Sequence, residues 1–326
     1  MHRRPLLAAA LGLPVAGFPV LARAQASYPD RPLRMIVPWP PGQATDLLGR
    51  IVAQKLSEGL GQPVVAENRA GGGGQIGTDA VAKAAPDGYT LLAASSGPVS
   101  INPLVQRTNY DPERDLAPVS NVGTSPYVLV VRPDFPATDI QSFIAEVKSK
   151  PGRYSFASSG AGATAHLVAE SFNRRAGLDA LHVPFPGSAP ALTAIAGKQV
   201  DYAVETLAGT QPLVRQGTLR AFGISLAKGS ALAPEIPPIS AVGGDLAGFD
   251  IGAWLGIMVP ARTPKPVIER LDAEIRKAMA TEDARARLAA TGLEPDYRGT
   301  EEFAALLRRQ REVFGAIVKA ANLRAD

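Results

Sequence analysis

Apolar and polar positions follow two different periods along this chain. Short runs with a period of two, such as Leu33-Arg34-Met35-Ile36-Val37, are typical of strands, and longer stretches with apolar residues three or four positions apart, as over 45–60, are typical of helices. The predicted strands span residues 32–38, 62–66, 89–94, 126–132, 153–157, 180–184, 200–205, 218–224 and 253–259. The predicted helices span residues 45–60, 75–85, 139–149, 163–176, 188–197, 206–216, 264–280, 282–290 and 300–322. Their alternation predicts an α/β fold of mostly parallel sheets flanked by helices.

The order of these elements predicts two lobes. A second strand–helix series begins near Ser125-Pro126 and is complete by about residue 225, where a stretch rich in Pro, Gly and Ala follows. The later strand and the three last helices need a sheet, and the first lobe offers one. We therefore expect residues 27–125 and 232–326 to form lobe 1 and residues 126–231 to form lobe 2, with a hinge where the chain crosses twice.

The first 26 residues have the pattern of an export signal. Arg3-Arg4 precede an apolar run over 6–21, and Ala22-Arg23-Ala24 and Ala24-Gln25-Ala26 both have the small-x-small form of a cleavage site. The run is short for a membrane anchor, and the arginine pair leaves Sec and twin-arginine export open. We predict that residues 1–26 are a signal peptide and that the mature chain lies in the periplasm.

Removal of this signal changes the charge balance. The whole chain has 34 Lys and Arg against 30 Asp and Glu, and the loss of Arg3, Arg4 and Arg23 leaves 31 basic residues. Such a near balance argues against a nucleic-acid partner. The chain has no cysteine, which excludes a disulfide and a thiolate nucleophile. No His, Asp and Glu cluster has the spacing of a metal site, so we expect no metal.

Two glycine patterns match the dinucleotide-binding fingerprint formally. They are Gly72-x-Gly74-x-x-Gly77 and Gly160-x-Gly162-x-x-Ala165. Neither lies in the first strand-to-helix turn, and no acidic residue clearly ends the next strand to hold a ribose. We therefore expect no cofactor. What the two patterns share with nucleotide sites is a glycine turn that lets backbone N–H groups approach a ligand.

The segment from Val37 to Asp46 carries a candidate anion site. A predicted strand runs into it and a predicted helix leaves it, so N–H groups at the start of the helix lie at the carboxyl end of a strand. Trp39 either packs over a ligand or fills the floor between the lobes. The candidate ligand contacts of this turn are Trp39, Pro41, Gly42, Gln43, Ala44 and Thr45.

Small polar residues stand at three later strand ends. Ser95-Ser96 follow the strand at 89–94, and Glu205 ends the strand at 200–205. Between them, the candidate contacts Ser158, Ser159, Gly160, Thr164, Ala165 and His166 form one strand-to-helix turn. Hydroxyls and N–H groups there suit a carboxylate, and Glu205 suits a ligand amino or hydroxyl group. Helix capping, a bare loop or a structural histidine fits the same residues, and the pattern leaves these alternatives open.

A series of short motifs then occurs in one order along the chain. They are Tyr28-Pro29-Asp30-Arg31-Pro32-Leu33, the Val37 to Asp46 turn, Glu67-Asn68-Arg69-Ala70-Gly71-Gly72-Gly73, Ala85-Pro86-Asp87-Gly88-Tyr89-Thr90-Leu91, Ile101-Asn102-Pro103, Tyr110-Asp111-Pro112, Val183-Pro184-Phe185, Gly187-Ser188-Ala189-Pro190-Ala191-Leu192, Leu219-Arg220-Ala221, and Trp254-x-Gly256 with Pro260-Ala261-x-Thr263-Pro264. Together they resemble the Bug-type periplasmic receptors of tripartite tricarboxylate transporters, over essentially the whole mature chain.

The resemblance implies a two-lobed periplasmic binding protein of type II, a "Venus flytrap". Such a receptor binds small carboxylates largely through backbone groups and ordered water, and presents them to membrane transporter subunits; we expect a monomer. It also implies that the turn over 41–45 holds the proximal carboxylate, that 158–166 adds contacts from lobe 2, and that Glu205 meets the variable end of the ligand.

Four places depart from the family's usual pattern, one of them the turn 160–162, which lacks the polar residue often seen there. Gln43 stands where a second Gly is common, Pro186 where Lys or Arg is frequent, and Glu205 where Asp is frequent. These changes favour a smaller, less charged or amide-bearing acid over the usual dicarboxylates.

The sequence thus predicts an exported, non-enzymatic solute receptor for a small carboxylate. One alternative is a receptor that reports its ligand to a membrane sensor kinase. Another is a periplasmic hydrolase using Ser95 or Ser158, which requires His166 within hydrogen-bond reach of the serine.

Overall fold

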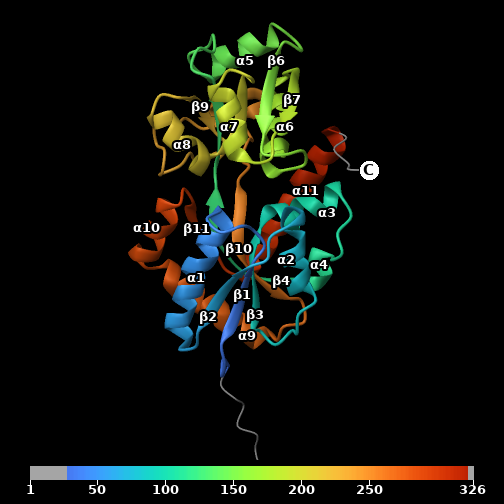
Figure 1. Cartoon of the computed structure of the whole chain (residues 1–326), viewed down its shortest axis with the longest axis vertical. Coiled ribbons are helices and arrows are strands. Elements are labelled where there is room, and N and C mark those ends of the chain that lie inside the picture. Colours follow the sequence, from blue (N-terminus) through green and yellow to red (C-terminus); the bar gives the residue numbers. More distant parts are fainter. Residues whose placement is uncertain (1–27, 322–326) are drawn as a thin grey trace, which may run out of the picture.

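The computed structural model describes residues 28–321, which form two β-sheets surrounded by helices (Figure 1). The first sheet has the strand order β11-β4-β10-β3-β1-β2, and the second has the order β7-β6-β8-β5-β9. The strands of the first sheet are β1 (Leu33–Val37), β2 (Val64–Asn68), β3 (Thr90–Ser95), β4 (Leu116–Ser125), β10 (Ala253–Pro260) and β11 (Glu294–Arg298). The strands of the second are β5 (Tyr127–Val131), β6 (Tyr154–Ser158), β7 (Ala180–Pro184), β8 (Tyr202–Thr206) and β9 (Arg220–Ile224).

Helices follow most of these strands. The α-helices are α1 (Ala44–Leu60), α2 (Gln75–Ala82), α3 (Asn102–Val105), α4 (Pro112–Asp115), α5 (Ile140–Lys148), α6 (Thr164–Ala176), α7 (Ser188–Ala196), α8 (Leu207–Arg215), α9 (Lys265–Met279), α10 (Glu282–Ala290) and α11 (Thr300–Ala321). Shorter turns of other helix types are η1 (Gly72–Gly74), η2 (Gly97–Ile101), η3 (Ile239–Val242) and η4 (Gly244–Leu246). Each predicted strand and helix overlaps an observed one, whereas β4, β11, α3 and α4 lie where the pattern predicts none.

The fold class is confirmed, but the sheets are mixed rather than mostly parallel. Strand β1 is parallel to β2 and β3, and β6 is parallel to β7 and β8. The other neighbouring pairs are antiparallel. The reason is the path of the chain: β10 enters the first sheet from the second and runs against β3, while β5 enters the second sheet from the first and runs against β8.

Both faces of the first sheet are buried, which explains the nearly continuous apolar run of β1. Met35 and Val37 pack with α1 and α9 on one face, and Ile36 packs with α2 and α11 on the other. The second sheet is covered in the same way. Leu129 packs on the side of α5 and α6, and Val128 on the side of α7. A sheet covered on both faces exposes its strand ends, and ligands of such α/β sheets bind there.

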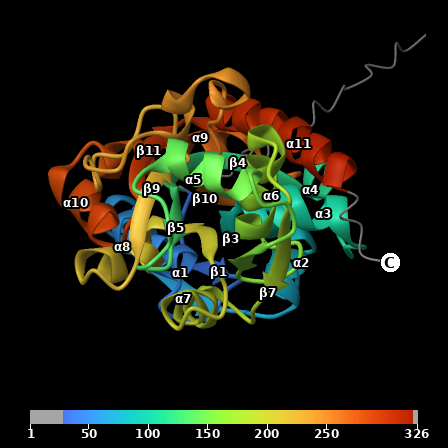
Figure 2. The same cartoon turned by 90° about the horizontal axis from the view of Figure 1, so that it is seen from above.

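The two sheets are joined by more than the two crossings that we predicted. Strand β4 ends at Ser125 and β5 begins at Tyr127, and β10 returns after a connector from β9. Helix α11 also joins them, because Phe303 packs with the first sheet and Phe314 with the second. Figure 2 shows α11 running beside α6.

This packing changes the predicted assignment of residues 232–326 to lobe 1. Ile239 and Phe249 of the connector, together with Phe314 and Ile317 of α11, lie in the core of the second sheet. Helix α11 has 22 residues, and its two ends pack in the cores of different sheets. The predicted signal peptide over 1–26 lies outside the described residues. Within 28–321, no helix combines the length and apolarity needed to span a membrane.

Candidate functional site

The first predicted turn leads from β1 into α1. Gln43 precedes α1 in an extended conformation and makes no capping hydrogen bond through its side chain, and Gly42 has a φ of +85°. The first helical hydrogen bond runs from Leu47 N to Gln43 O at 3.0 Å. The N–H groups of Ala44 and Thr45 precede that bond and have no acceptor within the helix. Such a helix start favours an anion.

A buried carboxylate already occupies part of this turn. Asp46, only 2% exposed, accepts hydrogen bonds from Gly42 N at 2.9 Å, from Asn68 Nδ2 at 2.7 Å and from Arg50 Nε at 3.0 Å. Burial raises the pKa of the Asp46 carboxyl, but the bonds from Arg50, Gly42 and Asn68 outweigh it and hold that pKa below its ordinary value. The Gly42 N–H is therefore used within the chain, and Gln43 is exposed, as are Pro41 and Gly42 before it, whereas Thr45 is buried.

Trp39 connects this turn with two others. Its Nε1 donates to Ser95 Oγ at 3.0 Å, at the end of β3. Its ring lies 3.4 and 3.5 Å from where a Cβ on Gly74 or Gly97 would stand. These contacts fix Trp39 against the turns that hold Gly74, Ser95 and Gly97, and contact of its ring with a ligand stays a prediction. Ser96, beside Ser95, is only 1% exposed, so it offers almost no surface to a ligand.

The second predicted turn leads from β6 into α6. Gly160 and Gly162 have φ values of +138° and +74°, and Ala163 precedes α6 without a capping side chain. Ser158 Oγ lies 2.7 Å from His182 Nε2, and the ring of His166 accepts the N–H of Gly162 at Nδ1, at 3.0 Å. Thr164 and Ala165 begin the helix. This start offers N–H groups to an anion in the same way as α1.

The hydrolase alternative requires a serine–His166 pair, and the structure does not contain it. Ser158 is paired with His182, and Ser158 is 0% exposed. The hydroxyl of Ser95 accepts from Trp39. A fully buried serine cannot reach a substrate, so Ser158 fixes the turn instead.

Glu205, at the end of β8, has a carboxyl group that is 0% exposed. Oε2 accepts from Ser188 Oγ at 2.7 Å and from Thr206 N at 3.2 Å, while Oε1 has no hydrogen-bond partner in the described structure. Burial raises the pKa of Glu205 above its ordinary value, although the polar groups of Ser188, Ser159 and Thr206 favour the anion. Oε1 has no exposed surface in this form, so it is an unsatisfied acceptor that a ligand reaches only when the groups around it move apart.

The structure thus assembles two separate groups. Trp39 to Thr45 lie with Ser95 on the first sheet, whereas Ser158 to His166 lie near Glu205 on the second. Among the described residues, no hydrogen bond is recorded between the two groups. Sequence reasoning missed Asp46 as an anchor of Gly42, although its i,i+4 spacing to Arg50 was a signal.

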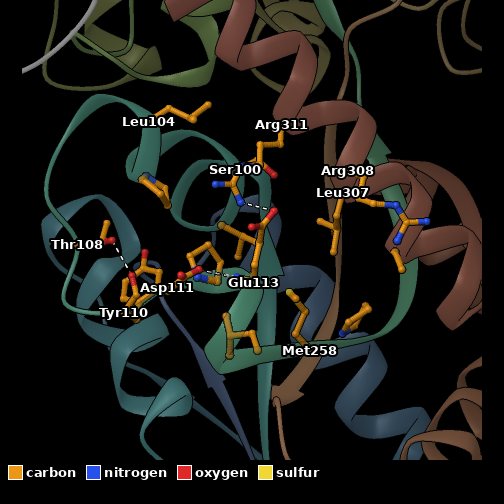
Figure 3. A pocket seen from close by; sticks show the side chains of 16 residues that line it. Ser100, Leu104, Thr108, Tyr110, Asp111, Glu113, Met258, Leu307, Arg308 and Arg311 are labelled. Carbon is orange, nitrogen blue, oxygen red and sulfur yellow. Dashed lines mark hydrogen bonds and ion pairs between the residues drawn. The ribbon is translucent and has the colours of Figure 1, made fainter.

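A cavity lies beside helix α11 (Figure 3). It has a volume of about 530 Å³ between η2, α3, α4, β10 and α11, and its floor includes Leu307 and Met258. At its edge Arg311 of α11 forms an ion pair with Glu113 of α4. No predicted site residue lines this cavity. Within the described residues there is no cluster of His, Asp and Glu that could hold a metal.

Comparison with known proteins gives one family. The model of the tripartite tricarboxylate transporter family receptor matches residues 48–323. Protein BugT of Bordetella pertussis is 38% identical over 292 residues, which cover 89% of this chain and 89% of that protein. Among solved structures, R. palustris Rpa4515 with adipate is 28% identical with a TM-score of 0.78, covering 90% of this chain and 98% of its own. MatC from Rhodopseudomonas palustris with bound malate is 30% identical with a TM-score of 0.75, covering 89% and 100%.

Proposed function

The chain belongs to the tripartite tricarboxylate transporter receptor family, and from this premise we propose that it binds one small carboxylate-bearing solute between the turns of its two sheets. The family is one of receptors, so the chain is a binding protein and not an enzyme. The observation that supports the proposal most is shared by α1 and α6. Both helices begin directly after a strand-end turn, without a side-chain cap. Their N–H groups suit the two oxygens of a carboxylate.

The chemistry around Glu205 narrows the class of ligand. Its Oε1 is buried and unpartnered, and burial raises its pKa. An ionised second carboxylate of the ligand would be repelled by an ionised Glu205. A hydroxyl, amide or ammonium hydrogen would instead satisfy Oε1. We therefore propose a carboxylic acid whose other end donates a hydrogen bond. Adipate and malate, carried by the two solved relatives, are natural probes, and malate also has a hydroxyl group.

The cellular role that we propose follows the family. Residues 1–26 would direct export to the periplasm, where the monomeric receptor passes its solute to membrane transporter subunits. A receptor that reports to a membrane sensor kinase would use the same site. Genes for membrane permeases beside this one support transport, and a neighbouring histidine kinase gene supports sensing.

The proposal is tested by a charge change in the first turn. Gln43→Glu places a carboxylate beside that of the ligand, and should weaken binding of an acid by about 1 kcal/mol or more. Gln141→Glu makes the same change at an exposed position on α5, and should leave affinity unchanged. Titration calorimetry measures the affinity of both variants, with malate or adipate as the ligand, whichever of the two binds. Equal affinity in the two variants would remove Gln43 from the site.

A further inference from the structure

Three aromatic rings stack beneath the second turn. Phe156 comes from β6, His182 from β7 and His166 from α6. The two imidazoles are nearly parallel, with ring centroids 3.7 Å apart and planes at 8°. Phe156 stacks on His182 with centroids 4.9 Å apart. In the strand pairing, Phe156 stands opposite His182, which brings the histidine under the end of β6.

Each imidazole is bonded to a different end of the turn. His182 Nε2 lies 2.7 Å from Ser158 Oγ, where the turn begins. His166 Nδ1 accepts the N–H of Gly162 at 3.0 Å, where the turn ends. Gly160 is held between them, because its N–H donates to Ser158 Oγ at 3.3 Å. The two histidines therefore fix the backbone that presents N–H groups at the start of α6.

This arrangement needs a neutral His166 and disfavours a charge on both rings at once. An acceptor at Nδ1 of His166 must have a free lone pair, which protonation of that nitrogen removes. Two parallel imidazolium rings at 3.7 Å would repel each other. The charged group facing the pair is Glu170 on α6, with Oε1 3.6 Å from His166 Nε2. The titratable Tyr202 of β8 packs against Phe156 with the ring planes tilted by 31° and donates to Asn173.

We propose that His166 and His182 are positioning residues, which hold the Ser158–Gly162 turn in its ligand-binding form while both rings are neutral, so that ligand binding weakens on acidification. The inference rests on the proposed function, because it takes this turn as a ligand contact. Burial and the neighbouring His166 lower the pKa of His182 to about 4, which is consistent with a neutral ring at pH 7. His166 is the ring whose free lone pair the turn uses directly, through the N–H of Gly162.

The first experiment needs no ligand. Histidine ring signals of the full chain are followed by NMR from pH 8 to pH 4, and His166→Asn and His182→Gln assign the signals of the pair. The proposal predicts that His182 titrates well below the ordinary value of about 6.5. It also predicts that the amide signal of Gly162 moves together with the His166 ring. The proposal would be overturned if His182 titrated at its ordinary value, or if the Gly162 amide signal did not move together with the signals of the His166 ring.

The second experiment measures affinity against pH with malate or adipate as the probe. The wild type should lose roughly tenfold between pH 7 and pH 4.5, as expected when a hydrogen bond that orders the turn is lost. His166→Asn keeps an acceptor near the Nδ1 position but cannot take a proton, so it should bind at pH 7 and lose much less. This variant also corrects for protonation of the probe itself. His166→Leu has no acceptor and should bind weakly at every pH.

Equal loss of affinity in the wild type and in His166→Asn would refute the positioning role. If neither of these dicarboxylates binds, and no monocarboxylate with a hydroxyl or amide group binds at any pH, the proposed ligand class fails. The NMR titration then still decides whether the histidine pair controls the turn.

Discussion

The carboxylate of Asp46 allows a sharp test of how the first turn is built. Asp46→Asn keeps the size of the side chain, but it replaces one acceptor oxygen by an NH₂ group. That group faces donors, because Asn68 Nδ2 and Arg50 Nε both point at the wild-type carboxylate. At most two of the three partners can still be accepted, because Asn68 and Arg50 bond Oδ1 whereas Gly42 bonds Oδ2. The variant should therefore be less stable and should hold Gly42 less firmly.

The magnitude follows from the number and kind of bonds. A hydrogen bond to a charged group contributes about 1.5–3 kcal/mol, and one or two such bonds are lost. Removal of one partner of a buried ion pair costs about 3–5 kcal/mol when the other stays buried. The Arg50 side chain is 48% exposed, so water can solvate it after the change. We therefore expect a loss of about 2–3 kcal/mol in the free energy of unfolding at pH 7.

Urea unfolding at several pH values measures this loss. The folded pKa of Asp46 lies below its ordinary value of about 3.9, so its stabilisation is complete above that pH and disappears as the pH falls through the folded pKa. The difference between wild type and Asp46→Asn should shrink in the same range. Glu269→Gln, which breaks an exposed i,i+4 pair with Lys265, should change stability by about 0.5 kcal/mol or less. A difference under about 1 kcal/mol, or one that grows toward acid, would refute the reasoning.

Three further changes test other parts of the structure. Trp39→Phe removes the hydrogen bond to Ser95 and should weaken carboxylate binding about fivefold, as measured by calorimetry. Trp254→Phe, in the core, should lower the free energy of unfolding by about 1 kcal/mol and leave the affinity unchanged. Equal effects of the two variants on affinity would contradict this prediction. His182 has a folded pKa of about 4, below its ordinary value, so the unfolded chain takes the proton first and stability should fall from pH 6.5 to pH 4. Because the ring is partly exposed, this contribution is limited to about 1–2 kcal/mol, and His182→Gln should lose correspondingly less stability over the same pH range in urea unfolding. Phe314→Ala should cost about 3–5 kcal/mol in urea unfolding, and a loss below 1 kcal/mol would show that α11 does not support the second sheet.

Most of the fold could be predicted because both sheets are covered on two faces. Strands such as β1 then read as apolar runs, which stand out between amphipathic helices. Strand β4 was not predicted, because it carries polar residues that are buried in the structure. Ser120 donates to Asp272 Oδ1 at 2.6 Å, and Asn121 donates to the Asp296 carbonyl at 2.7 Å. Such partners stand more than a hundred residues away, so the local pattern gives no sign of them.

The candidate site could be predicted in part for a related reason. The turns at the ends of β1 and β6 are local features. The glycines at 160 and 162 indicated the second turn, and both have a positive φ in the structure. The pairing of Ser158 with His182 depends on the register between β6 and β7. A single sequence does not contain that register. The sequence therefore indicated His166 as a candidate, but it did not predict the role of His182.

The central claim is that the two turns bind a carboxylate, and titration calorimetry of the purified protein tests it most directly. The panel contains malate, adipate, monocarboxylates with a hydroxyl or amide group, and the methyl ester of each acid. We predict that at least one acid with a donor group binds at a ratio of one to one, and that its ester does not. A thermal shift should accompany binding, since a ligand at 100 times its Kd adds about 2.7 kcal/mol of stability. Binding of an ester as tight as that of its acid, or no binding by any acid, would contradict the account.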